Sequence, residues 1–225
     1  MGCTTSRATS TTTQTTSISK KVDHQTTETG IADPNASISP TFALGAGCYW
    51  GTEKFIVKDF QKRFPKSIAN AKVGFMSINP NNPLKNPSYK QVCRGNSGYI
   101  EVLNVKLNNP TPELFEALIR FFFTFHDPTT RDRQGNDWGS QYGSVIFCSD
   151  KEQVQIALKV KQQLQTLITE KKIKAFSQKE VSTGIVDYTR FIKAEAAHQN
   201  YLAKHPFGYC NHRIRFKNWP PKGVE

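Results

Sequence analysis

The sequence predicts an α/β fold that follows a polar N-terminal segment. Beyond residue 40, short apolar or alternating segments typical of strands take turns with longer segments whose apolar residues recur at helical spacing. Residues 1–40, by contrast, contain 11 Thr and 6 Ser and no Phe, Trp or Tyr. The chain of 225 residues is therefore expected to hold one folded domain, residues 41–225.

The composition of residues 1–40 predicts a disordered tail. Its few Ile and Val residues cannot bury enough apolar surface to offset the entropy lost on ordering. Its three basic and three acidic side chains balance, so the formal net charge of +12 resides on the rest of the chain. Such a charge favours non-specific contact with polyanions. A basic module that binds nucleic acid or an anionic membrane is therefore the non-enzymatic alternative, although Lys and Arg cluster only in Arg213–Lys217.

The first six residues fit the pattern for N-myristoylation, with Gly2 exposed once Met1 is removed and Ser6 at the favoured position. Cys3 is a candidate for palmitoylation, and a second acyl chain is what makes anchoring stable. No apolar run is long enough for a bilayer span, and residues 1–40 lack the apolar stretch of a secretory signal. We expect a cytoplasmic protein, attached to the cytoplasmic face of a membrane if Gly2 and Cys3 are acylated.

Strands and helices are expected to alternate from residue 41 onward. The segments expected to form strands are 41–44, 71–76, 98–107, 143–148 and 180–187. The segments expected to form helices are 49–63, 111–123, 150–171 and 195–204. Thr111 followed by Pro112, and Asp150, carry the signals of helix starts. Residues 77–97 are rich in Asn, Pro and Gly and are expected to form a long, functional loop.

Cys48 is the candidate nucleophile. It follows an expected strand and a Gly-Ala-Gly turn, and it stands where a helix should begin. Unpaired amides and the macrodipole at a helix N-terminus stabilise an anion, so we expect this thiol to have a lowered pKa and to react as the thiolate. Tyr49 and Trp50 can wall an apolar pocket beside it. A buried structural cysteine is the alternative interpretation.

Glu101 is the candidate acid. In the expected strand 98–107 it shares a face with Leu103 and Val105, whereas Asn104 and Lys106 point to the other face. A carboxyl group buried on an apolar face has a raised pKa and stays protonated near neutrality. The alternative is a side chain at the end of the strand that reaches solvent.

Several short motifs follow one another along the expected domain. The residues Gly47-Cys48-Tyr49-Trp50-Gly51 are similar to the G-C-[FY]-W-G signature of the A-type peptide methionine sulfoxide reductases. The further motifs are Asn86–Cys93, Gly98–Val102, His126–Thr130, Arg133–Asp137, Gly139–Tyr142, Ala194–Leu202 and Gly208–Cys210. Together they span residues 41 to 210, and motifs in matching order are far more specific than any one of them.

The resemblance implies a mechanism. Cys48 would attack the sulfoxide sulfur, Glu101 would donate a proton to the oxygen, and Tyr49 and Trp50 would hold the substrate's S-methyl group. The remaining polar groups of the site would be Tyr89, Tyr142 and Asp137. Methionine would leave Cys48 as a sulfenic acid.

A second thiol must then condense with the sulfenic acid. Cys210 is the main candidate, since its segment from about residue 205 is rich in Gly and Pro and is expected to be mobile, and since His212, Arg213 and Arg215 are expected to favour its thiolate. Cys93 is the reserve candidate, and Cys148 is expected to serve packing. Thioredoxin would reduce the disulfide between Cys48 and Cys210.

Some positions depart from the family pattern. Tyr99 and Ile100 replace the usual His and Ala and are expected to reshape the pocket beside Glu101, and Ala196 stands where an acidic residue is common. The alternative enzyme is a cysteine hydrolase that pairs Cys48 with His126 or His198. Such an enzyme needs neither a reductant nor a second cysteine.

The combined prediction is a monomeric reductase of methionine-S-sulfoxide, both free and in oxidised proteins. The expected fold is a two-layer α/β sandwich with a ferredoxin-like mixed sheet and packed helices. Neither Cys-x-x-Cys nor His-x-x-x-His spacing occurs, and no Gly-rich nucleotide loop is present. We therefore expect no metal, no tightly bound cofactor and no specific nucleic acid, with thioredoxin as the reducing partner.

Overall fold

The computed structural model describes residues 38–217 and residue 219. The predicted acylation sites Gly2 and Cys3 and most of the predicted tail lie outside these residues, so those expectations stay predictions. Ile38 belongs to the folded part because it is buried, and the amide of Ser39 donates to the Asp150 carboxylate at 2.5 Å. None of the helices in the described part of the chain has the length and apolarity that a membrane crossing requires.

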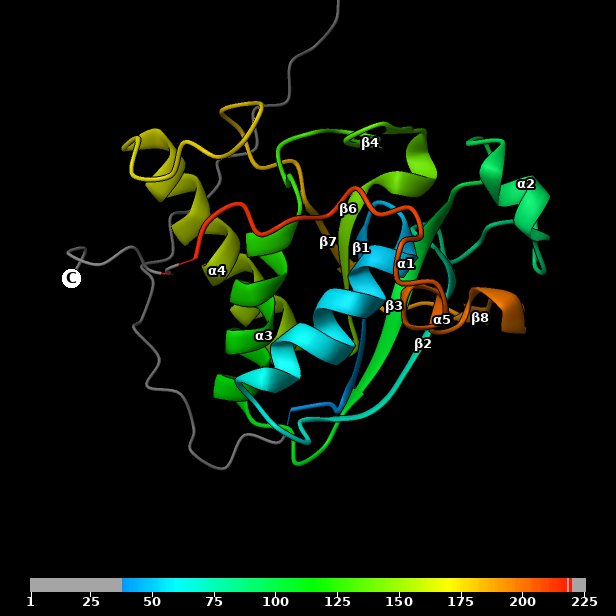
Figure 1. Ribbon diagram of the computed structural model, residues 1–225, viewed down its shortest axis with the longest axis horizontal. Coiled ribbons are helices and arrows are strands. Elements are labelled where there is room, and N and C mark those ends of the chain that lie inside the picture. The colour runs from blue at the N-terminus through cyan, green and yellow to red at the C-terminus, as the bar shows by residue number, and fades with distance from the viewer. Residues whose placement is uncertain (1–37, 218, 220–225) are drawn as a thin grey trace, which may run out of the picture. The chain divides into compact units, whose positions relative to one another are not determined.

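Six strands form the main sheet, in the order β7-β6-β1-β3-β2-β8 (Figure 1). They are β1 (Thr41–Ala46), β2 (Ile68–Ser77), β3 (Tyr99–Leu107), β6 (Ser144–Cys148), β7 (Gly184–Asp187) and β8 (Ile192–Lys193). Neighbours run antiparallel except for β6 and β7, so the sheet is mixed. Its central order β6-β1-β3-β2 is the expected ferredoxin-like arrangement. Two short strands, β4 (Arg133–Gln134) and β5 (Asp137–Trp138), pair apart from it.

The longest helical segments cover one face of this sheet (Figure 1). The helices are α1 (Tyr49–Glu53), which continues as a π-helix (Lys54–Asp59) and a 3₁₀ turn (Phe60–Lys62), α2 (Tyr89–Cys93), α3 (Pro112–Phe125), α4 (Lys151–Thr169) and α5 (Tyr201–Lys204). Apolar residues of α1, α3 and α4 form one core with Phe42 and Leu44 of β1 and Leu103 of β3. A smaller apolar cluster lies on the opposite face. The predicted two-layer sandwich is confirmed.

Side-chain caps fix two of the helix starts where the sequence predicts them. The Thr111 hydroxyl accepts a hydrogen bond from the Leu114 amide at 3.1 Å, directly before Pro112 at the first position of α3. The Asp150 carboxylate accepts one from the Gln153 amide at 2.7 Å at the start of α4. Each cap satisfies an amide that has no partner within the helix.

Three expectations about secondary structure are wrong in part. Residues 77–97 are not all loop, because Ser88 and Gln91 form a capping box that starts α2. The helix expected over 195–204 is divided into a 3₁₀ turn and α5, since Asn200 has a left-handed φ of 53°. The strand expected over 180–187 begins only at Gly184.

The buried Gln199 side chain joins β2 to the segment before α5. Its amide oxygen accepts from the Val73 N–H at 3.0 Å, and its amide nitrogen donates to the carbonyls of Val73 and Ala194, each at 2.9 Å. These bonds take the place of a longer strand at the edge of the sheet, where β8 has two residues.

Replacing Gln199 with Ala should destabilise the fold. The change leaves the Val73 N–H buried without a partner, and an unsatisfied group of this kind costs about 1–3 kcal/mol of unfolding free energy. Urea denaturation at equilibrium measures this loss. Gln178→Ala is the matched control, because Gln178 is exposed, and it should stay within about 0.5 kcal/mol of wild type. Equal denaturation midpoints for the two variants would contradict the assigned role.

Candidate active site

Cys48 lies at the junction between β1 and α1. The strand ends at Ala46, Gly47 turns the chain, and Cys48 is the N-cap of α1. Gly47 has a left-handed φ of 89°, and a Cβ atom there would lie 2.5 Å from the Cβ of Gln134, so the turn requires glycine. The thiol therefore stands where the strand stops and the helix starts, as the sequence predicts.

The electrostatics of Cys48 differ from the expectation. The residue is 7% exposed, and burial raises the pKa of its thiol, with the Glu101 carboxylate raising it further. The backbone N–H of Trp50 lowers this pKa, as a helix N-terminus should, but burial outweighs it. The expected lowered pKa is thus wrong. In the protein without substrate, Cys48 is a neutral thiol at pH 7.

Glu101, the third residue of β3, points into the core. It is 2% exposed, on the same face as the buried residues Leu103 and Val105. Its carboxyl group accepts a hydrogen bond from the Tyr49 amide, one residue after Cys48, at 3.2 Å. Burial raises the pKa of Glu101 to about 8, and the negative charge of Asp137 contributes to the rise. The carboxyl group is therefore mostly protonated at pH 7 and available as an acid.

Two tyrosine hydroxyl groups lie close enough to this carboxyl group for its charge to affect their pKa. Tyr89 begins α2, and Tyr142 ends a 3₁₀ turn (Ser140–Tyr142) before β6. Burial raises the pKa of both phenols, and the charge of Glu101 adds to each. The Cys93 thiol, four residues along α2, contributes to the raised pKa of Tyr89. The structure therefore brings Glu101, Tyr89 and Tyr142 together, with Cys93 beside Tyr89 at the far end of α2.

An aromatic cluster surrounds the start of α1. Trp50 is half-buried and stacks on Tyr201 of α5, with ring centroids 3.7 Å apart and planes at 15°. His198 stacks on the Trp50 ring at 5.8 Å and packs against Tyr89 at 4.6 Å. Tyr49 is fully buried behind them, so of the two expected pocket residues only Trp50 has exposed surface.

The sequence predicts no site role for Tyr201, and for His198 it predicts only the role of base in the alternative hydrolase. The signal available was the aromatic and His content of the motif Ala194–Leu202. Asn200 lies between these two residues, and its left-handed backbone turns both rings toward Trp50. Nothing in the sequence indicates this backbone conformation.

Asp137 binds the two residues that flank Cys210. Its carboxylate accepts hydrogen bonds from the Tyr209 hydroxyl at 2.9 Å and from the Asn211 side-chain amide at 2.8 Å. The charge of Asp137 also raises the pKa of Cys48 and of Tyr142. Asp137 therefore holds the chain on either side of the second cysteine, and its charge acts on two of the predicted site residues.

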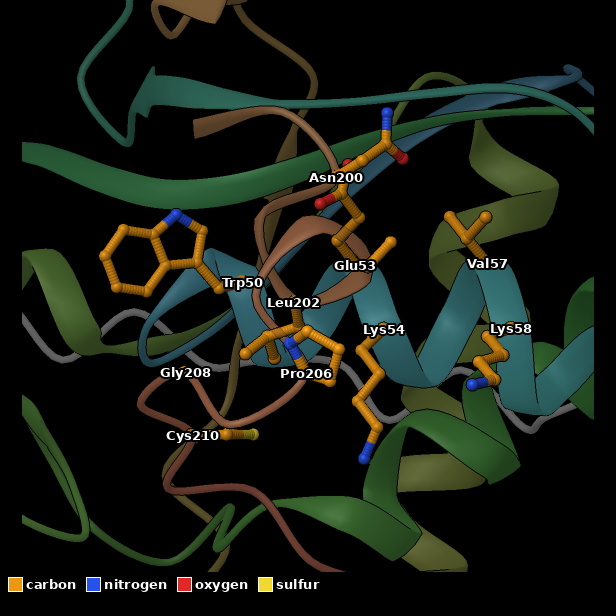
Figure 2. A pocket seen from close by; sticks show the side chains of 11 residues that line it. Trp50, Glu53, Lys54, Val57, Lys58, Asn200, Leu202, Pro206, Gly208 and Cys210 are labelled. Carbon is orange, nitrogen blue, oxygen red and sulfur yellow. The ribbon is translucent and has the colours of Figure 1, made fainter. Parts of the chain in front are cut away.

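Cys210 is half-buried. A negative charge on Cys210 is the smallest of the causes that raise the pKa of the Cys48 thiol. Cys210 also lines a cavity of about 220 Å³ together with Trp50, Leu202 and Pro206 (Figure 2). Both cysteines are free thiols in this structure. Cys148 is buried on β6 away from these groups, as expected of a packing residue.

The expectation that His212 supplies positive charge next to Cys210 is wrong. His212 is buried, and burial lowers its pKa to about 4, so its ring is neutral at pH 7. The charge of Arg215 is engaged with Asp127, with 3.6 Å between the guanidinium nitrogen and the carboxylate oxygen. Of the three expected cations, only Arg213 is exposed and outside such contacts in the described part of the chain.

Neither histidine of the alternative hydrolase is paired with Cys48. His126 is fully buried and bonds to the Phe122 carbonyl and the Ser144 hydroxyl, both at 2.8 Å, and burial lowers its pKa to about 3. His198 faces the aromatic rings of the cluster around Trp50. Within residues 38–217 and 219, no group of three or more His, Cys, Asp or Glu side chains is arranged to hold a metal ion.

The two unusual residues next to Glu101 point in opposite directions. The Tyr99 hydroxyl donates to the Leu84 carbonyl at 2.5 Å and so ties the segment before α2 to β3. Ile100 belongs to the small cluster on the other face of the sheet. Ile100 therefore does not reshape the space beside Glu101, because neighbouring residues of a strand face opposite sides.

The region that carries this site is similar to known proteins. A family model described as peptide methionine sulfoxide reductase matches residues 40–220. The peptide methionine sulfoxide reductase MsrA of Saccharophagus degradans is 37% identical over 194 residues, which cover 86% of this chain and 82% of that protein. The mitochondrial peptide methionine sulfoxide reductase of Bos taurus is 39% identical over 168 residues, covering 74% of this chain and 65% of that protein.

Solved structures are similar as well. Mxr1 from Saccharomyces cerevisiae in its reduced form has a TM-score of 0.64 at 32% identity, covering 78% of this chain and 92% of that one. Methionine sulfoxide reductase A of Corynebacterium diphtheriae has a TM-score of 0.60 at 29% identity, covering 79% and 80%. With a family model that matches most of its length and relatives of this identity, the chain belongs to the peptide methionine sulfoxide reductase family.

Proposed function

We propose that this protein reduces methionine-S-sulfoxide, in oxidised proteins and as the free amino acid, to methionine with thiols as the source of electrons. Its family is that of peptide methionine sulfoxide reductases. The observation that carries the proposal for this chain is the buried Glu101 carboxyl group, bonded to the amide directly after Cys48 and protonated at pH 7. A neutral acid beside a nucleophile is what protonation of a sulfoxide oxygen requires.

In the first step, the Cys48 sulfur attacks the sulfoxide sulfur while Glu101 donates a proton to the sulfoxide oxygen, and the proton that leaves the Cys48 thiol replaces the one given by Glu101. The Tyr89 and Tyr142 hydroxyls assist at that oxygen, and Trp50 offers an apolar surface to the S-methyl group. The Cys48 thiol and the sulfoxide become a Cys48 sulfenic acid and methionine, so the oxygen moves to Cys48. A protonated Glu101 also removes the negative charge that would oppose a Cys48 thiolate.

In the second step, the Cys210 thiol condenses with the Cys48 sulfenic acid. A disulfide forms and one water molecule leaves. Two observations support this pairing. A charge on Cys210 raises the pKa of Cys48, and Asp137 accepts hydrogen bonds from both neighbours of Cys210. Cys93, which lies at the end of α2 beside Tyr89, is the reserve candidate. Thioredoxin then reduces the disulfide to two thiols.

Serine variants of the cysteines should separate the two steps. Cys48→Ser should have no detectable turnover. Cys210→Ser should keep most of its turnover with dithiothreitol, which reduces the sulfenic acid directly, but should lose on the order of 10²-fold with thioredoxin, because the neighbouring thiol is gone. Turnover of the separated S and R epimers of a methionine sulfoxide peptide measures this, with the S epimer alone as substrate.

Cys93→Ser is the matched control for these variants and should keep both activities. If Cys93→Ser loses the thioredoxin-dependent activity and Cys210→Ser keeps it, the resolving role belongs to Cys93. If wild type reduces neither epimer, the proposed function is wrong.

The rate should follow the protonation of Glu101. Because burial raises the pKa of Glu101 to about 8, the acid is present below that pH, and kcat/KM should fall as the pH rises through about 8. Glu101→Gln keeps an acceptor for the Tyr49 amide but has no acidic proton. We expect it to lose about 10²- to 10⁴-fold in kcat/KM, and its residual activity to show no limb near pH 8. If kcat/KM of Glu101→Gln still falls as the pH rises through about 8, a group other than Glu101 causes that fall.

We further propose that acylation of Gly2 and Cys3 attaches this protein to a membrane. The support is the sequence Met1-Gly2-Cys3 with Ser6 at the favoured position. In a eukaryotic host, Gly2→Ala should move the protein from the membrane to the supernatant fraction, and Cys3→Ser should leave weak, reversible binding from the single myristoyl chain. Metabolic labelling with a myristate analogue checks the modification, and wild-type protein without label would contradict it.

A further inference from the structure

His212 packs against the chain on both sides of Cys48. Its Nε2 bonds to the Ala46 carbonyl at 2.7 Å, two residues before Cys48. Its ring lies against Gly51, three residues after Cys48, where a Cβ atom would come within 2.0 Å of Nδ1. Phe55 and Phe125 enclose the ring, with centroids at 6.3 and 5.6 Å. The imidazole of His212 therefore packs against the loop that carries Cys48.

The same histidine follows Cys210 by two residues. The Cys210 thiol donates to the His212 carbonyl at 3.8 Å, so the thiol and the imidazole belong to one compact turn. Beyond His212 the chain is tied to the end of α3, where the Arg213 and Arg215 amides donate to backbone carbonyls at 3.2 and 2.8 Å. Asn211 and His212 lie between Cys210 and this contact with α3. The Asn211 side chain bonds to Gln134 and Asp137, so within the described residues only the His212 imidazole links this stretch to the loop that carries Cys48.

The tautomer of His212 follows from its surroundings. Burial, together with the charges of Arg215 and Lys54, lowers its pKa to about 4, so the ring is neutral and Nε2 carries the proton donated to Ala46. Nδ1 has no hydrogen-bond partner. A neutral ring in this position does not act as an acid or a base toward the substrate, and its contacts are those of an anchor.

We propose that His212 is a positioning residue for disulfide formation, which holds Cys210 against the Cys48 loop through its bond to the Ala46 carbonyl. The step it serves is Cys48–SOH plus Cys210–SH giving the Cys48–Cys210 disulfide and water, so the inference rests on the proposed function. Methionine formation, which precedes this step, does not depend on it. Holding a thiol near its target can account for large rate factors, because misplacement by about 1 Å costs on the order of 10²-fold.

Two amide variants test the proposal while keeping the position polar and of similar size. In His212→Gln the side-chain nitrogen can reach the place of Nε2, whereas in His212→Asn it reaches only the place of Nδ1. The reduced enzyme is mixed with one equivalent of methionine-S-sulfoxide without reductant. Methionine is measured by chromatography, disulfide by quenched alkylation and mass, and sulfenic acid by trapping with dimedone.

We expect both variants to form methionine within about twofold of the wild-type rate. His212→Asn should form the disulfide at least about tenfold more slowly and accumulate trapped sulfenic acid, and His212→Gln should recover most of the wild-type rate. Lys217→Gln is the matched control in the same segment, because the Lys217 side chain is exposed and has no part in the site, and it should behave as wild type. Circular dichroism confirms that each variant is folded.

Three outcomes would overturn the proposal. One is wild-type disulfide formation in His212→Asn, and another is equal slowing in His212→Asn and His212→Gln. The third is a matching loss of methionine formation in His212→Asn, which would mean that His212 supports the Cys48 loop itself. Failure of the proposed function is distinguishable from all three, since wild type would then form no methionine.

Discussion

The hydrogen bond between the Tyr49 amide and the Glu101 carboxyl group is the contact on which the site depends. It joins the first residue of α1 to the central strand β3, and it is made in a core from which water is excluded. A carboxylate in such a place is costly unless it is paired, and the protein lowers this cost by keeping Glu101 protonated. This one hydrogen bond therefore fixes both the position of the acid, Glu101, and the orientation of the loop that carries Cys48.

The C-terminal segment completes the site from outside the sheet. Asp137 holds the neighbours of Cys210, and His212 bonds to the loop that carries Cys48. Its residues reach partners far back in the chain, 166 positions away in the case of Ala46. Tertiary contacts of its neighbours thus position the Cys210 thiol, which lies in the segment after α5 and not on a helix or strand of the sandwich.

Local patterns made much of the site predictable. The position of Cys48 followed from a Gly-rich turn between strand and helix patterns, and the direction of Glu101 followed from the alternation along β3. The pKa of Cys48 did not follow, because the sequence indicates a helix end but not the depth of burial there. His212 was misread for the same reason: a basic neighbour of Cys210 in the sequence is a neutral, buried ring in the fold. The contacts of Asp137 with Tyr209 and Asn211 join residues more than 70 positions apart, and no local pattern signals them.

The protonation state of Glu101 is the central claim, and it can be measured directly. Carboxyl ¹³C shifts of labelled protein, followed from about pH 5 to about pH 9 and assigned by comparison with Glu101→Gln, report the titration of this group. The account predicts that the Glu101 signal is that of a protonated carboxyl group at pH 7 and titrates near pH 8. A signal already ionised at pH 5, with no change up to pH 9, would contradict it.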